Sequence, residues 1–382
     1  MKISKDVFFL IFVTLAMGLM IWFGLRQTTD FGINLSHAAY PRARVVEVVS
    51  DQTTVDEDGV RRGRQDLIVE ILTGEHRGKI VEAQNILFID AAVYAQPGQR
   101  IVLFFEYFSE NSTYFARVHA YERATAIYII VLLFLGLLAV VGGKAGFRSA
   151  FGLIFTFVTI LFLLIPAIAL GAPPAITTLF LSILIIAVSL IAIMGFQKKT
   201  YVAIAGTVIG IVLCCLFYFM LAPILRITGF NLPEMSILVT VGFAANARIA
   251  ELLFCGILIA SLGAVMDIAV SVASATAEIG QSGGKADFKS LLNKSMIVVK
   301  DCIGSSVNTL ILAFTGAFFV TLVLFRLNNF DYHMIIHRVD IAIEVLRAIT
   351  ASAALVLCAP ATAIIGSRIY CVQLNSKRRK MK

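Results

Sequence analysis

The chain has 382 residues, of which 59% are hydrophobic and only 15% are charged, and its mean hydropathy is +0.89. This balance excludes a soluble globular domain and indicates an integral membrane protein. The formal net charge of +8 would suit nucleic-acid binding on a folded surface, but much of it lies in short gaps between apolar runs and in the tail "SKRRKMK". The basic residues therefore indicate membrane topology, and no nucleic-acid partner is expected.

Apolar runs of about 20 residues are long enough to cross a hydrocarbon core and predict about eight helices. The first run has Lys2 and Lys5 before it, yet it is too long and lacks a small-residue cleavage site, so we expect a retained anchor and not a signal peptide. Basic connections alternate along the chain, which puts both termini in the cytoplasm by the positive-inside rule. The predicted spans are 7–25, 124–142, 149–170, 175–195, 201–222, 251–277, 302–325 and 343–365.

One large polar segment, 37–122, follows the first run and is expected to be extracytoplasmic. It alternates apolar and polar residues between Gly, Pro, Asp and Asn turns, which predicts strands. Five short strands of this kind predict a small all-β domain, an OB-like barrel, although such a fold does not by itself imply a ligand. The predicted strands are 43–50, 65–72, 78–84, 98–107 and 113–121.

The expected organisation is thus a polytopic α-helical membrane protein, N-in and C-in, with an extracytoplasmic β domain. We expect a transmembrane anchor at 7–25, a β domain at 37–122, a seven-helix membrane domain at 124–366 and a basic cytoplasmic tail at 367–382. Residues 223–250 are either an outer loop or a re-entrant segment. The small-residue pattern "GTVIG" (206–210) predicts close helix packing.

The stretch "MDIAVSVASATAEI" (266–279) is unusually polar for a membrane helix. At 100° per residue its polar side chains fall within about 60° of one another, while apolar residues occupy the opposite face. The next apolar run repeats the pattern in "VKDCIGSSVNTLILAFTG" (299–316). The two stripes contain Asp267, Ser271, Ser274 and Glu278, followed by Asp301, Ser305, Asn308 and Thr315.

A carboxylate inside a bilayer costs several kcal/mol unless it is paired, protonated or hydrated. Hydrogen bonding between helices needs only hydroxyls, so we interpret Asp267 as a proton or cation site, with the serines and Asn308 as oxygen ligands of H⁺ or Na⁺. For Asp301, an equally good interpretation is a helix cap or a charge that interacts with the helix dipole, because it lies near the cytoplasmic start of its helix. The latter part of the linker 280–299 is spaced like an interfacial amphipathic helix.

Two charged pairs occur at one-turn spacing, Glu344 with Arg347 and Arg248 with Glu251. Both are expected near the outer surface as salt bridges that hold helix position, with a gate as the alternative. His333 and His337 have an i, i+4 spacing that binds zinc when a third ligand joins, but no HExxH motif accompanies them. The 6 cysteines form no CxxC pair. No metal and no cofactor are expected, apart from a coupling H⁺ or Na⁺.

The ordered motifs resemble the YibE/F family of bacterial multi-span membrane proteins. They are "GAVMDIAVSVASATAEI", "VVKDCIGSSVNTLILAFTG" and "EVLRAITASAALVLCAPATA", with "ILTGEHRGKIVEAQNIL" in the β segment. Family members often carry Arg where this chain has Lys300, and Thr-Met where it has Ser305-Ser306. The resemblance implies the bacterial cytoplasmic membrane, and a paralogous membrane subunit or a homo-oligomer as partner. It implies no established biochemistry.

A second likeness is to the Sec protein-export accessory subunits and their resistance–nodulation–division relatives, in which an Asp-bearing span precedes a basic linker and a hydroxyl-rich span. Ion-coupled transport or export assistance is therefore the favoured function. A non-catalytic scaffold or assembly protein of a heteromeric complex is the alternative. An intramembrane aspartyl protease is a remote one, because Asp301 follows "VVK" and the GxGD marker is absent. No hydrolase or transferase motif was found, so we do not expect an enzyme.

Overall fold

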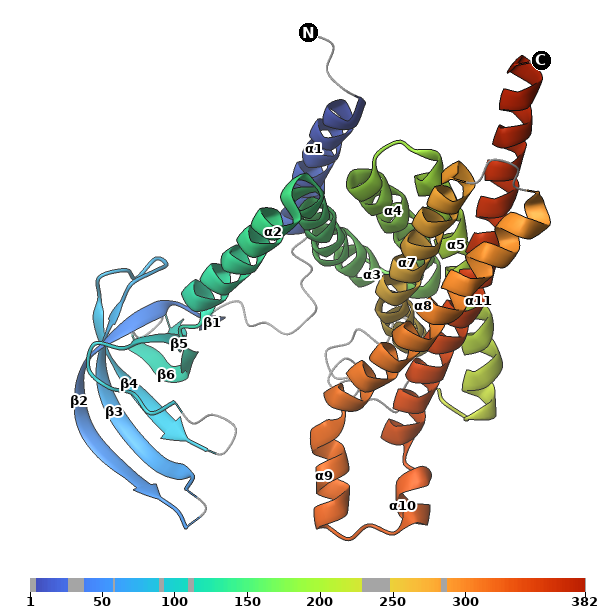
Figure 1. Ribbon diagram of the computed structural model, residues 1–382. Helices are drawn as coiled ribbons and strands as arrows, with labels where there is room; N and C mark the ends of the chain where they lie inside the picture. The colour runs from blue at the N-terminus through green and yellow to red at the C-terminus, as the bar shows by residue number, and fades with distance from the viewer. Residues whose placement is uncertain are drawn as a thin grey trace. The chain divides into compact units, whose positions relative to one another are not determined.

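A computed structural model describes residues 5–26, 38–57, 59–88, 93–108, 113–228, 248–282 and 287–381. The chain divides into two compact units (Figure 1). One comprises Met1–Thr29 and Leu138–Lys382, and the other comprises Asp30–Leu137. Each unit has a hydrophobic core of its own.

The unit Asp30–Leu137 is built on a β-sheet whose strands alternate buried and less buried residues. In β3, for example, Leu67, Val69 and Ile71 are buried and the residues between them are only partly so. This period of two is what places one face of a strand in a core. The five predicted strands are all present, with a two-residue strand before them: β1 (Ala38–Ala39), β2 (Arg42–Val55), β3 (Arg61–Ile71), β4 (Ile80–Leu87), β5 (Arg100–Phe108) and β6 (Thr113–Tyr121).

The strands form one curved sheet in the order β1-β5-β2-β3-β4-β6, and β6 also pairs with β5. The neighbours β2–β3, β3–β4 and β5–β6 have long antiparallel ladders, whereas β4 and β6 run parallel and meet at a single residue pair, Gln84 with Arg117. One pair is no ladder, so the sheet is not a closed barrel. The prediction of an OB-like barrel is therefore wrong, because the sheet does not close. Closure depends on pairing between distant strands, which the alternation of residues does not reveal.

Two polar side chains lie fully inside this unit and are held by hydrogen bonds. The Asn85 side-chain amide donates to Gln65 Oε1 at 2.8 Å and to the Val93 carbonyl at 2.6 Å. The Ala95 backbone N–H donates to the same Gln65 oxygen at 3.0 Å. Buried polar groups are stable only when they are paired in this way. The network therefore attaches the segment around Val93 and Ala95 to β3 and β4.

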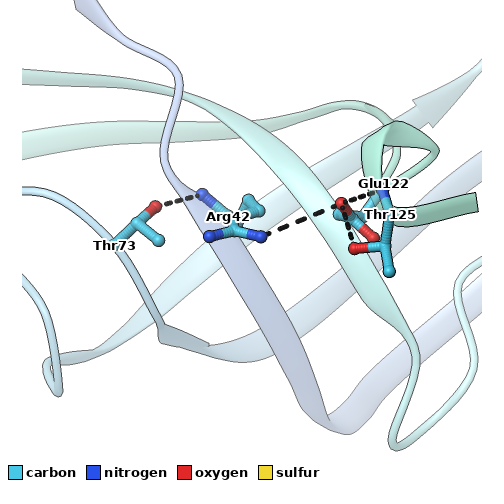
Figure 2. Close-up of polar contacts among 4 residues, drawn as sticks. All are labelled: Arg42, Thr73, Glu122 and Thr125. Atoms are coloured by element: carbon cyan, nitrogen blue, oxygen red, sulfur yellow. Dashed lines mark hydrogen bonds and ion pairs between the residues drawn. The ribbon is translucent and has the colours of Figure 1, made fainter. Parts of the chain in front are cut away.

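The sheet is joined to the start of α2 (Ala124–Thr159) by a small polar cluster (Figure 2). Glu122 Oε1 accepts hydrogen bonds from the backbone N–H and the hydroxyl of Thr125, each at 3.2 Å. Arg42 Nη1 lies 4.0 Å from that oxygen, and the Arg42 backbone N–H donates to Thr73 Oγ1 at 2.9 Å. A carboxylate at a helix N-terminus is favourable because the helix dipole is positive there. Glu122 thus connects the first turn of α2 to β2.

In the described part of the chain, seven helices are long and apolar enough to cross a membrane. The sequence predicted about eight; the difference lies in Ala124–Ala169, which counts as one helix of 46 residues. The helices other than α2 are α1 (Lys5–Arg26), η1 (Ile160–Leu164, a π-helix), α3 (Ile165–Ala169), α4 (Pro174–Met194), α5 (Lys198–Ile224), α7 (Ile249–Ser282), α8 (Phe288–Ala317), α9 (Phe319–Leu327), α10 (Tyr332–Ile336) and α11 (Val339–Met381).

Gly143 interrupts the long helical run. Its backbone has φ 52° and ψ −132°, which lies outside the helical region and which glycine adopts without the steric cost of a Cβ. Just beyond it, Gly146 lies against the Leu138 carbonyl, where a Cβ would collide. The predicted runs 124–142 and 149–170 lie on either side of this break, and each is about long enough to span a bilayer.

The core of the helical unit is built by α5, α7 and α11, which lie side by side, with α8 against α7 and α11 (Figure 1). Gly206 and Gly210 of α5 permit this closeness. A Cβ on Gly206 would collide with Thr362, and one on Gly210 would collide with Val265 and lie in tight contact with Cys358. Small residues allow helix backbones to approach in this way. The prediction that 206–210 packs helices is confirmed.

Two predicted segments, the basic tail and the loop or re-entrant segment, stay predictions. The helix α11 continues past residue 366, where a basic tail was expected to begin, and ends at Met381. Residues 229–247, which contain most of the predicted loop or re-entrant segment, lie outside the described residues.

Candidate functional site

The polar stripe predicted on 266–279 lies on α7, on the side facing away from the bundle. Ile268 and Val272 are buried in the core, whereas Asp267 and Ser271 are exposed. The stripe extends further toward the helix start than the sequence pattern indicated, as a row of small residues. In order along α7 it contains Gly256, Ala260, Gly263, Asp267, Ser271, Ser274 and Glu278, of which only Ser274 is half-buried.

This exposed face of α7 lacks the side chains that lipid normally contacts. Among the residues of α7 whose side chains are described, no exposed one is a large apolar residue. Around Gly256 and Gly263 there is open space where a Cβ would be. By contrast, α5 exposes Val212 and Leu216, which suit contact with acyl chains. A surface of Gly and Ala permits another helix to approach closely.

The second predicted stripe is exposed on α8. Asp301, Ser305 and Asn308 all lie on the outer side of this helix, while Leu291, Ser295 and Val299 are buried against the bundle. The hydroxyls further along α8 bond within their own helix, as Thr315 Oγ1 does to the Ile311 carbonyl at 2.9 Å. We call the exposed stripes of the two helices together the α7–α8 polar face: Asp267, Ser271, Ser274 and Glu278 with Asp301, Ser305 and Asn308.

Two expectations about the second stripe are wrong. The helix α8 begins at Phe288 and is capped by Asp287, whose side chain accepts the Phe288 backbone N–H at 2.9 Å, so Asp301 is not a helix cap. No separate interfacial helix precedes it, because the linker residues from 288 onward belong to α8 itself. Asp301 lies about three and a half turns into α8, and Asp267 lies about four turns before the end of α7. The two carboxylates are therefore at similar heights in this helical hairpin.

Neither the Asp267 nor the Asp301 carboxylate has a hydrogen-bond or ion-pair partner within the described part of the chain. Two unpartnered carboxylates at such depth, flanked by hydroxyls and an amide, can take up and release protons or coordinate a hard cation through oxygen atoms. Both tasks need water or a second protein surface over the face, since hydrocarbon would disfavour the ionised state.

Both predicted ion pairs form. Arg347 Nη1 lies 2.8 Å from Glu344 Oε1, and Arg248 Nη1 lies 3.1 Å from Glu251 Oε1. The second oxygen of Glu251 also accepts the backbone N–H of Ala175 at 3.0 Å, a contact between α7 and the first turn of α4 that the sequence did not indicate. Glu251 therefore caps a neighbouring helix as well as pairing with its own arginine.

The histidine pair forms no recognisable metal centre. The nearby carboxylate of Asp331 caps α10 by accepting the His333 backbone N–H at 3.1 Å. His337 lies at the C-cap of the same short helix. Across the described ranges there is no group of three or more His, Cys, Asp or Glu side chains that could hold a metal ion.

Sequence reasoning missed a set of hydroxyls buried where α7, α8 and α11 meet. Thr276, Ser295 and Ser367 are buried, and their hydroxyls have no hydrogen-bond partner among the described residues. One turn or less away, Ala277, Leu291 and Tyr370 pack together from the same three helices. For a single Ser or Thr in an apolar helix, the sequence does not show whether the side chain faces the bundle or the exterior. These buried positions could therefore not be predicted.

The β unit has a separate surface depression of about 680 Å³. It borders the weakly joined β4–β6 edge, and Gln84 of that edge is one of its lining residues. Glu82 and the ion pair of Arg64 with Asp66 at 2.8 Å supply its charge. The depression is large enough for a small ligand, but its one basic side chain, Arg64, is already paired with Asp66.

These features define a membrane-embedded protein with several long apolar helices and a small sheet domain. Comparison with protein-family models matches residues 130–371 to the YibE/F-like protein family, and the chain belongs to that family. The matched range includes α7, α8 and most of α11, and thus the entire α7–α8 polar face. No curated protein and no solved structure matches the chain.

Proposed function

We propose that this protein is an ion-coupled membrane transporter or export-assisting protein in which Asp267 and Asp301 form a proton or cation site. The observation that carries the proposal is the α7–α8 polar face, where two carboxylates lie at similar height on the exposed sides of consecutive membrane helices. A bilayer disfavours an ionised carboxylate at mid-depth by about 3 kcal/mol or more. A surface with two of them suits water or protein, and not lipid.

The face is completed, in this proposal, by a second copy of the chain. Gly256, Ala260 and Gly263 continue the stripe beyond Asp267, and their spacing lets an identical helix cross closely. Two chains with the same membrane orientation would then bring their Asp267 residues toward a common axis. Serine and asparagine oxygens around them would line a narrow polar route. A paralogous subunit is the other candidate for this face. Disulfide cross-linking through the face distinguishes it from a second copy of the chain.

The proposed setting is the bacterial cytoplasmic membrane, with both termini in the cytoplasm and the β unit outside. Alternation of basic connections along the sequence supports this orientation. The β unit would then handle the transported or exported material while protons or Na⁺ pass the α7–α8 polar face. No covalent chemistry is part of the proposal.

Asp267→Asn is expected to abolish ion flux in liposomes, because an amide cannot exchange a proton or neutralise a cation. The purified protein is reconstituted with a pH-sensitive dye inside, and a second series uses a Na⁺-sensitive dye. Wild type should dissipate one of the two gradients, and Asp267→Asn should match empty liposomes. The matched control is Asp287→Asn, which removes a carboxylate from the same hairpin while Asn still caps α8.

If wild type and Asp267→Asn give equal flux, and the variant still complements a deletion strain, the ion-site proposal is wrong. That result favours the scaffold alternative. Asp301→Asn then distinguishes a single site from a shared one. Full flux through Asp301→Asn would restrict the site to α7.

A further inference from the structure

A cavity of about 500 Å³ lies at the opposite end of α7 from the α7–α8 hairpin, where α4 begins and α5 ends. This volume falls in the range of small-molecule sites, about 300–1,000 Å³. Three candidate spans reach their limits at this point, namely Pro174–Met194, Lys198–Ile224 and Glu251–Gln281. From the length and composition of these spans, we expect the cavity at the boundary between hydrocarbon and lipid head groups.

One wall of the cavity is aromatic and aliphatic. The ring of Phe254 lies 5.0 Å from that of Tyr218 and 5.2 Å from that of Phe219, centre to centre, and Ala222 and Ile227 extend the same surface. Phe254 and Tyr218 are buried, so the wall is fixed, while Phe219 is 62% exposed. Such a surface accepts an apolar body, and aromatic faces also attract an ammonium group.

Two opposite charges line the same cavity. Arg226 follows α5 with a left-handed backbone, φ 52°, and its guanidinium has no ion pair within the described ranges. Glu251 is held in place by Arg248 and by the Ala175 backbone N–H, at 3.1 Å and 3.0 Å. A planar guanidinium matches the geometry of a phosphate, and at this depth of a bilayer phosphates are the abundant anions.

We propose that this cavity binds the head group and glycerol region of an aminophospholipid. The lipid phosphate lies on Arg226, its ammonium lies beside Glu251 and the aromatic faces, and the first part of an acyl chain covers the apolar wall. A lipid with only negative charge would gain no attraction from the Glu251 carboxylate, and a purely cationic amphiphile would meet Arg226. The proposal concerns a site separate from the α7–α8 polar face and does not depend on ion coupling.

The test uses the full chain, purified in mild detergent, stripped of lipid and mixed with phosphatidylethanolamine, phosphatidylglycerol or inorganic phosphate. Native mass spectrometry counts the bound molecules. Wild type is expected to retain phosphatidylethanolamine in preference to phosphatidylglycerol. Arg226→Asn should weaken retention by about tenfold or more, because a charge-assisted hydrogen bond is lost. Asn tolerates the left-handed backbone, so the fold is preserved.

Arg326→Asn, on the exposed surface of α9, is the matched control and should retain the lipid as wild type does. Glu251→Gln keeps an oxygen for the Ala175 N–H and removes the charge. This variant should bind both lipids equally. Equal retention by Arg226→Asn and Arg326→Asn would overturn the site. Equal binding of the two lipids by wild type would overturn the ammonium assignment, and displacement of the lipid by inorganic phosphate alone would indicate a free-phosphate site instead.

Discussion

Gly210→Leu is expected to destabilise the helical unit by about 3 kcal/mol, the upper part of the usual range for forcing a side chain into a packed core. A Cβ at this position would collide with Val265 of α7 and lie 3.1 Å from the Cβ of Cys358 on α11. Neither neighbour can withdraw, because both are fully buried. The measurement is the midpoint of thermal unfolding in detergent, together with the size-exclusion profile. We expect a lower midpoint and aggregation.

Gly18→Leu serves as the control for this prediction. Gly18 lies on α1, a Cβ added there would meet no atom of the described ranges within 4 Å, and Leu has the higher helix propensity. The control should be as stable as wild type or slightly more so. Gly210→Ala should fall between the two, since it adds only one carbon. Wild-type stability of Gly210→Leu would mean that α5, α7 and α11 do not pack as described.

Gly263→Leu is expected to separate the two chains of the proposed pair and to abolish ion flux while leaving Asp267 in place. The larger side chain would hold the partner helix away from α7, where Gly263 now leaves open space. The single chain itself should remain folded, because no atom of the described residues lies within 4 Å of a Cβ placed at this position. Light scattering in detergent measures the oligomeric state, and the liposome assay measures the flux.

Cross-linking identifies the partner on this face. The six native cysteines are first replaced. Gly263→Cys is then compared with Leu216→Cys on α5, where the native Leu216 is 60% exposed. Oxidation should join two Gly263→Cys chains into a covalent dimer and leave Leu216→Cys monomeric. Absence of a dimer in native membranes, where any paralogous subunit is also present, would contradict the second copy as the occupant of the face.

The strands and most spans could be predicted because their signals are local. Alternation located all five long strands, and the length of apolar runs located the membrane helices. The start of α8 was missed for a physical reason. Polar residues of the linker, such as Lys289 and Lys294, are compatible with a helix whose Leu291 and Val299 are buried against the bundle. Burial on one face, and not average polarity, determined where that helix begins.

The direction in which the α7 stripe points could not be predicted. A helical period shows that Asp267, Ser271 and Ser274 share a face, but the choice between bundle and exterior depends on which neighbours pack against Ile268 and Val272. The small residues Gly256 and Gly263 lie in the same row and were the signal that could have extended the stripe. The contact of Glu251 with Ala175 joins residues 76 positions apart and likewise had no local signal.

Titration of the Asp267 side chain in the membrane is the most direct measurement of the proposed ion site. Infrared difference spectra of the reconstituted protein are recorded from about pH 4 to pH 9, for wild type and for Asp267→Asn. We predict a carbonyl band of a protonated carboxyl group that changes with pH in wild type and is missing in Asp267→Asn. Identical spectra for the two proteins across this range would show that Asp267 does not exchange its proton, and would contradict ion coupling through the α7–α8 polar face.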